Sequence, residues 1–109
     1  MTDSAAIARL RALVGGPRDG ALLRVALANA LQGEQQSDAA IAQLRHALEF
    51  DAGYSAAWKM LGSALAEQGD SAGAMDAYRA GIAAAEKRGD MQALKEMQVF
   101  LRRLGKGRV

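Results

Sequence analysis

Few side chains in this sequence of 109 residues are of the types that carry out catalysis or hold a metal ion. It contains no cysteine and one histidine, His46, which excludes thiolate chemistry and a pair of histidine ligands within it. We expect His46 to be a partly exposed surface residue of a helix. The acids Glu49 and Asp51 lie close together where that helix should end, and two acids in a solvated turn are common.

The remaining candidates for chemistry are equally weak. Gly105-Lys106-Gly107 lacks both the preceding strand and the spaced glycines of a phosphate-binding loop. The serines, the tyrosines and the one threonine have no evident base beside them in the sequence. We therefore expect a binding module and not an enzyme, with no catalytic, cofactor-binding or metal-binding residue.

The charge pattern provides a second clue. The 14 basic and 12 acidic residues leave a net charge of +2, which is too small to indicate nucleic-acid binding. Four basic residues follow the last acid, Glu96: Arg102, Arg103, Lys106 and Arg108. We interpret them as a solvated helix end and a basic tail. Contact with an anionic partner such as nucleic acid is the alternative, disfavoured because aromatic residues make up only 5% of the chain.

Composition points to helices in a soluble protein. Half of the residues are hydrophobic, many of them alanine, and Pro17 is the only proline. Small side chains allow helix axes to approach closely, and helix interiors reject proline. The first residues lack the features of a signal peptide, and no stretch approaches the roughly 20 apolar residues that span a bilayer. We expect a cytoplasmic protein with no membrane contact.

The chain repeats itself with a period of 34 residues. Six positions of the second copy keep their size class, or nearly so, in the first copy: Leu61, Gly62, Leu65, Ala74, Tyr78 and Gly81 correspond to Leu27, Ala28, Leu31, Ala40, Leu44 and Ala47. Trp58 corresponds to Arg24, which is a real departure. Such a period indicates a helical hairpin repeated in tandem.

The conserved sizes have a physical reason. Gly62 is small where a second helix should cross closely, and Tyr78 should fill the space beside Ala74 on that helix. Residues 69–71, Gly-Asp-Ser, supply a helix stop followed by a helix cap. Residues 33–38 are expected to play the same part in the first copy.

The motif Trp58-x-x-Leu61-Gly62-x-x-Leu65, followed by Ala74-x-x-x-Tyr78, resembles the signature of the tetratricopeptide repeat (TPR). The resemblance implies an all-α fold, a right-handed α-solenoid of antiparallel helix hairpins with about six helices. In this family the first helix of each repeat lines a concave groove that holds a peptide or helix. Carried over to this chain, the groove residues are Leu22, Val25, Asn29, Gln32, Lys59, Ser63, Ala66 and Glu67.

We expect one domain over residues 1–109. Its predicted parts are an N-terminal helix (4–14), repeat 1 (21–54), repeat 2 (55–88), a C-terminal capping helix (90–104) and a basic tail (105–109). Asp90 should cap the last helix, and Gly105 should end it. The apolar face of the first helix would comprise Ala6, Ile7, Leu10, Leu13 and Val14.

The leading functional hypothesis is a protein-interaction module that binds a peptide or helix of a partner protein in the groove. The alternative is a structural subunit that self-associates into a homo-oligomer, because a short solenoid leaves apolar ends uncovered. The partner's identity does not follow from any residue.

Overall fold

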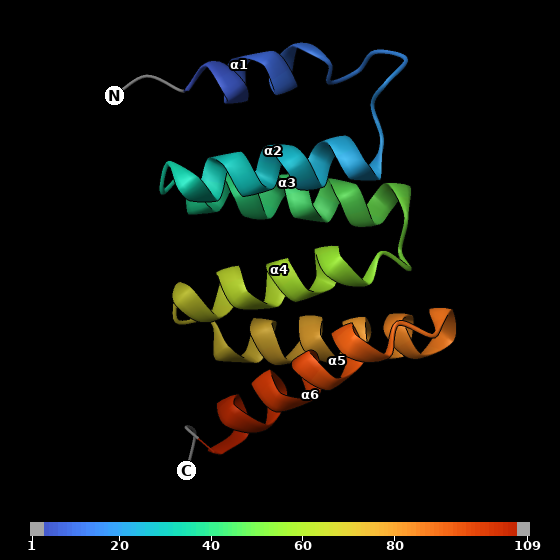
Figure 1. Ribbon diagram of the computed structural model, residues 1–109. Helices are drawn as coiled ribbons and strands as arrows, with labels where there is room; N and C mark the ends of the chain where they lie inside the picture. Colours follow the sequence, from blue (N-terminus) through green and yellow to red (C-terminus); the bar gives the residue numbers. More distant parts are fainter. Residues whose placement is uncertain (1–3, 107–109) are drawn as a thin grey trace. The chain divides into compact units, whose positions relative to one another are not determined.

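The computed structural model describes residues 4–106, which form six α-helices and no strand (Figure 1). The helices are α1 (Ala5–Ala12), α2 (Ala21–Gly33), α3 (Ser37–Phe50), α4 (Ser55–Glu67), α5 (Ser71–Arg88) and α6 (Met91–Lys106). Their contacts divide the chain into a first unit, Met1–Asp51, and a second unit, Ala52–Val109. The all-α fold of helical hairpins is confirmed for the described residues.

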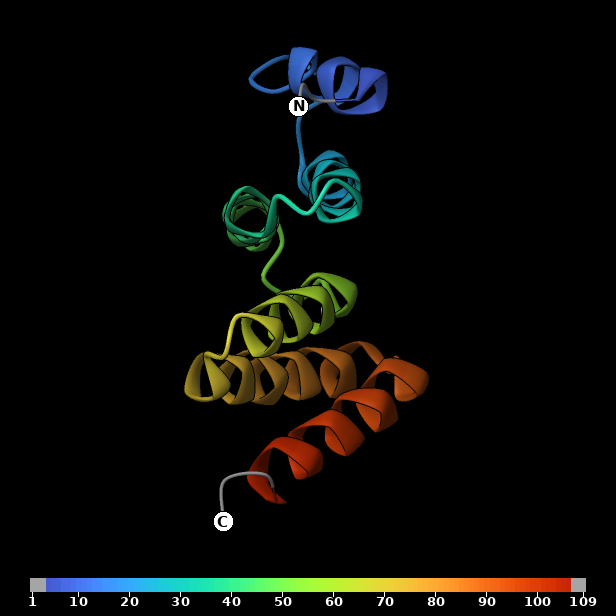
Figure 2. The same cartoon turned by 90° about the vertical axis from the view of Figure 1, so that its left-hand side faces the viewer.

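The first unit is the hairpin α2–α3 with α1 against α2 (Figures 1 and 2). Its core consists of large side chains that are fully buried: Ile7, Leu27, Leu31 and Leu44. Leu27 and Leu31 lie one turn apart on α2, and Leu44 comes from α3, so the helical spacing in the sequence produces the packed face.

The turn of each hairpin depends on one residue with a left-handed backbone. In the second unit it is Gly69, with φ of 83°, and the next amide, that of Asp70, donates to the carbonyl of Leu65. In the first unit Gln35 has φ of 61°, and the amide of Gln36 donates to the carbonyl of Leu31. Residues 33–38 thus form the expected turn. The left-handed residue is not the glycine of that segment, because Gly33 is still the last residue of α2.

The second unit is the hairpin α4–α5 with α6 packed mainly on α5. A β-carbon on Gly62 would lie 2.5 Å from Cε1 of Tyr78, a ring that is only 3% exposed. A β-carbon on Gly81 would lie 2.5 Å from Sδ of Met97, the largest fully buried side chain of α6. Both glycines are therefore required by close helix packing, as the sequence predicted for Gly62.

Asp90 caps α6 as predicted. Its Oδ1 accepts from the amide of Ala93 at 3.2 Å, and its Oδ2 accepts from Oγ of Ser55 at 2.8 Å. Ser55 is the first residue of α4 and is buried. The cap of the last helix therefore also ties that helix to the start of α4.

The terminal helices differ from the prediction at their ends. The first helix ends at Ala12 and not at residue 14, and of its five predicted apolar residues only Ile7 is buried. The turns that follow carry Leu13 and Val14 into solvent. The last helix continues through Gly105 to Lys106, because the backbone of Gly105 does not leave the helical region and its surroundings are open. The part of the predicted tail that includes Arg108 lies outside the described residues.

Candidate functional site

Arg24 is held inside the first unit, at the position that corresponds to Trp58. The residue is 9% exposed. Its Nε donates to Oδ1 of Asp19 at 2.8 Å, its Nη2 to Oδ2 of Asp19 at 2.9 Å, and its Nη1 to Oε1 of Gln43 at 2.9 Å. The guanidinium carbon lies 5.8 Å from the centre of the Phe50 ring. Hydrogen bonds and a cation–π contact therefore take the place of an indole.

The charges of this cluster stabilise each other. Hydrogen bonding from Arg24, supported by the amide of Gly15, holds the pKa of Asp19 well below its usual range. The same bond raises the pKa of Arg24. Both groups stay ionised at neutral pH, so the pair acts as a fixed brace between α2 and the turn before it, with no proton to exchange.

The predicted groove residues of α2 lie outside the buried set of that helix. Leu22 is 73% exposed and Asn29 is exposed, whereas Val25 and Gln32 are half-buried. The buried residues of α2 are Leu23, Arg24, Leu27, Ala28 and Leu31. The four predicted residues thus share a face of α2 that remains at least partly open.

The predicted groove residues of α4 are partly engaged with their own unit. Nζ of Lys59 lies 2.7 Å from Oε1 of Glu96 on α6, and Oγ of Ser63 lies 3.0 Å from the hydroxyl oxygen of Tyr78. Ala66 is half-buried and Glu67 is exposed. The face of α4 therefore carries an ion pair and a hydroxyl pair, both already formed.

Glu96 of α6, which pairs with Lys59, is a residue that the sequence-based prediction omitted. The period of 34 carries Lys59 to Ala93, and Glu96 lies about one helical turn beyond it on α6. Extending the repeat register into the last helix would have indicated that α6 stands where a further first helix would stand. Lys59 also contributes to lowering the pKa of Asp90, after the hydrogen bonds from Ser55 and from the amide of Ala93.

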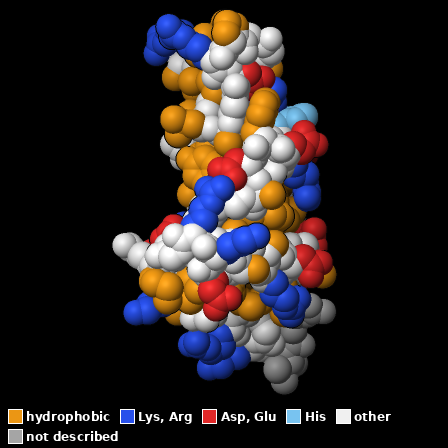
Figure 3. All heavy atoms as spheres, turned by 90° about the vertical axis from the view of Figure 1, so that its right-hand side faces the viewer, with side chains coloured by type: hydrophobic (Ala, Val, Ile, Leu, Met, Phe, Trp, Pro, Cys, Tyr) orange, Lys and Arg blue, Asp and Glu red, His pale blue; other side chains and the backbone are white. Residues whose placement is uncertain are grey.

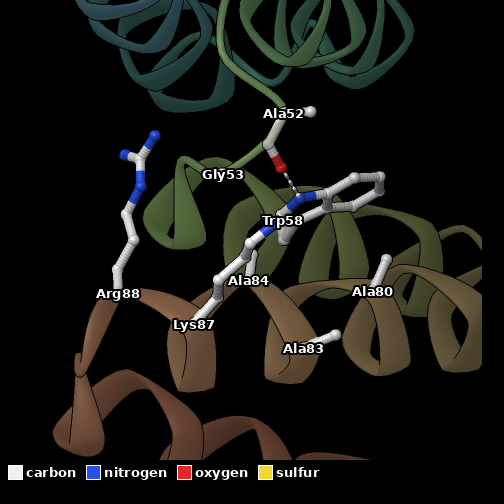
Figure 4. Close-up of a pocket in the computed structure, with 8 residues that line it drawn as sticks. All are labelled: Ala52, Gly53, Trp58, Ala80, Ala83, Ala84, Lys87 and Arg88. Atoms are coloured by element: carbon white, nitrogen blue, oxygen red, sulfur yellow. Dashed lines mark hydrogen bonds between the residues drawn. The ribbon is translucent and has the colours of Figure 1, made fainter.

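A hollow of about 250 Å³ opens in the second unit (Figure 4), and none of the predicted groove residues lines it. It is lined by Ala52, Gly53, Trp58, Ala80, Ala83, Ala84, Lys87 and Arg88. Nε1 of Trp58 donates to the carbonyl of Ala52 at 2.8 Å, which fixes the indole at the edge of the hollow. The sequence-based prediction did not identify this site. The run of alanines on α5 could have indicated it, because small side chains leave space beside a large one.

Groups suited to other chemistry are scattered among the described residues. Nδ1 of the exposed His46 lies 3.1 Å from Oε1 of Glu49. Residues 4–106 contain no group of three or more residues that could hold a metal ion, and none of their helices is long and apolar enough to cross a membrane. Figure 3 shows basic and acidic side chains interspersed on the face in view, without one large basic patch. Arg102, Arg103 and Lys106 are exposed on α6.

A TPR repeat-containing protein of Pseudomonas aeruginosa is 44% identical to this chain over 90 residues, which cover 83% of this chain and 86% of that protein. The chain belongs to the tetratricopeptide repeat family. This confirms the resemblance read from Trp58 to Tyr78. The family's general role is protein–protein interaction, and its members are generally non-enzymatic scaffolds.

Two solved structures resemble this one. A protein of Bordetella parapertussis, whose solution structure is known, shares 49% identity with a TM-score of 0.81, over 95% of this chain and 90% of that one. The crystal structure of the MamA protein has a TM-score of 0.71 at 24% identity, and the match covers 92% of this TPR chain and 57% of that chain. The second likeness concerns the fold alone. No family model matches the sequence.

Proposed function

We propose that this TPR domain binds a peptide or helix of a partner protein on the open faces of its first helices, α2 and α4. The observation that carries the proposal is the position of the eight predicted residues, none of which belongs to the buried set of its helix. Side chains that pack inside a hairpin cannot contact a partner, whereas these eight are exposed or half-buried.

The face of α2 offers both apolar contact and hydrogen bonding. Leu22 exposes 73% of its surface, which a partner side chain could cover. Asn29 lies two turns further along the helix, and its amide can donate to and accept from a peptide backbone. A partner segment running along α2 would make an apolar contact with Leu22 and then hydrogen bonds with Asn29.

The face of α4 offers paired charges. Because Lys59 is bound to Glu96, the surface presents an ammonium and a carboxylate side by side, 34% and 40% exposed. Such a pair favours a partner that carries both charges, or that bonds through its backbone, over a purely acidic tail. Ser63 adds a hydroxyl close to this pair along α4.

Affinity capture with matched variants tests the proposal. We expect the wild-type domain to retain a partner protein that Asn29→Ala with Lys59→Ala fails to retain. The control is Lys95→Ala, which removes the same charge as Lys59→Ala from the exposed side of α6. Purified partner and domain are then titrated by calorimetry, and equal affinities for the wild type and the double variant would remove these faces from the proposal.

Self-association is the second candidate, supported by the exposed rings and chains of the first unit. Phe50 is 54% exposed and Leu22 is 73% exposed, so both apolar side chains are open to contact with a second copy. If these residues join two copies, sedimentation at rising concentration should show a dimer that Leu22→Ser with Phe50→Ser disrupts. A wild-type monomer throughout would exclude it.

A further inference from the structure

Larger side chains stand at the positions of the first unit that correspond to the small residues of the hollow beside Trp58. Counting back 34 residues, Trp58 corresponds to Arg24, Gly53 to Asp19 and Ala84 to Phe50. In the first unit Arg24 contacts both of the other residues: it forms an ion pair with Asp19 and a cation–π contact with the ring of Phe50. In the second unit Gly53 and Ala84 carry no such side chains, the guanidinium of Arg88 lies against Gly53, and a hollow remains beside the indole of Trp58.

The walls of the hollow combine an apolar floor with a basic rim. Alanines from α5 and from the turn before α4 surround the indole of Trp58 (Figure 4). Lys87 and Arg88 end α5 at the rim, and the guanidinium of Arg88 lies against Gly53, within 2.9 Å of where a β-carbon would stand. None of the eight lining residues is acidic.

These two features define the chemistry of an occupant. An indole and small side chains favour a large apolar side chain, and the volume is sufficient for one. Lys87 at the rim favours a carboxylate next to that side chain. At the corresponding position of the first unit, Phe50 places an aromatic ring beside Arg24, the counterpart of Trp58, although the ring remains 54% exposed.

We propose that the hollow binds an acidic peptide segment of a partner protein, with one aromatic or branched apolar side chain against Trp58 and flanking carboxylates at Lys87. This second site shares no residue with the faces of α2 and α4, so it stands independently of the function proposed for them.

The single tryptophan of the chain reports directly on this site. Purified domain is titrated with peptides of four glutamates around a central Phe, Leu or Ile, while the emission of Trp58 is followed. The matched probes replace the central residue with Gly or the glutamates with lysines. We expect a saturable change with at least one acidic apolar peptide below about 5 mM, a weak but measurable affinity, and none with the matched probes.

Two variants and two controls locate the binding. Ala84→Phe restores the residue of the first unit and should abolish the response by filling the hollow; Ala84 is only half-buried, and the thermal midpoint checks folding. Lys87→Glu should weaken binding by about tenfold or more. Arg79→Glu, an equal charge change on the exposed face of the same helix, should preserve the affinity, as should Lys59→Ala.

Any of four outcomes would overturn the proposal. One is the absence of a saturable response with every acidic apolar peptide, and another is a response that survives Ala84→Phe. A third is equal weakening by Lys87→Glu and Arg79→Glu, because nonspecific attraction to a basic surface would behave in that way. Loss of binding in Lys59→Ala alone would assign the peptide to the face of α4 instead.

Discussion

Arg24 and Trp58 occupy the same position in the two repeats, and both reach back to the turn before their own helix. Arg24 bonds to Asp19, five residues earlier, and Trp58 bonds to the carbonyl of Ala52, six residues earlier. One brace is an ion pair and the other a neutral hydrogen bond. The two repeats therefore reach the same local architecture through different chemistry, and of these two contacts only the Arg24–Asp19 pair should depend on pH.

Acid should weaken the first unit through Asp19. Its folded-state pKa is lowered, so its stabilising effect is complete above the unfolded value of about 4 and is lost as pH falls through the folded value. The pKa of Asp90 is also lowered, so acid should weaken the second unit in the same direction. Denaturant melts across pH 2 to 7 should show Asp19→Asn with lower stability at pH 7 and a flatter acid limb. Asp76→Asn, at an 81% exposed carboxylate, is the control and should leave the profile unchanged.

Replacing Gln35 with glycine should stabilise the domain. Its φ of 61° is unfavourable for a residue with a β-carbon, and the corresponding residue in the second unit is Gly69. We expect Gln35→Gly to raise the free energy of unfolding by about 0.5–1 kcal/mol and Gly69→Ala to lower it by about 1–2 kcal/mol. Urea denaturation measures both, and a destabilised Gln35→Gly would show that this side chain contributes more than the backbone strain costs.

A methyl group at Gly62 should disrupt the second hairpin. It would meet the buried ring of Tyr78, which cannot move aside as the end of a flexible chain could. Gly62→Ala is expected to lower the free energy of unfolding by about 1–3 kcal/mol. Gly105→Ala, where the space is open, should raise it by about 0.5–1 kcal/mol. Equal effects from the two substitutions would contradict close helix contact at Gly62.

Removing Lys59 should leave stability almost unchanged. The Lys59–Glu96 pair is one-third or more exposed on each side, and exposed pairs contribute less than about 1 kcal/mol. A double-mutant cycle with Lys59→Ala and Glu96→Ala measures the coupling, which should decrease further at high salt. A coupling well above 1 kcal/mol would mean that this ion pair is structural, and Lys59→Ala would then be unsuitable for the capture experiment.

The helical hairpins could be predicted from the sequence, because the packing of two helices where they cross depends on the sizes of side chains at fixed positions along each helix. The sizes of Gly62 and Tyr78 predicted the contact between them, and Asp70 and Asp90 were predicted as the helix caps that they form. Boundaries were less accurate at the chain's ends. There Leu13 and Val14 resembled a continuing apolar face, and Gly105 resembled a helix stop. All three positions are exposed to solvent, where packing places little constraint on the residue at which a helix ends.

The sequence by itself determined the helical repeat, the absence of thiol chemistry and the family, since these depend on residue types and a period of 34. Only the tertiary structure decided where Arg24 would find its partners, that Glu96 would meet Lys59, and that a hollow would remain beside Trp58. Each of these depends on which side chains from separate helices fill or leave a given volume, and on charges brought together only when the helices pack.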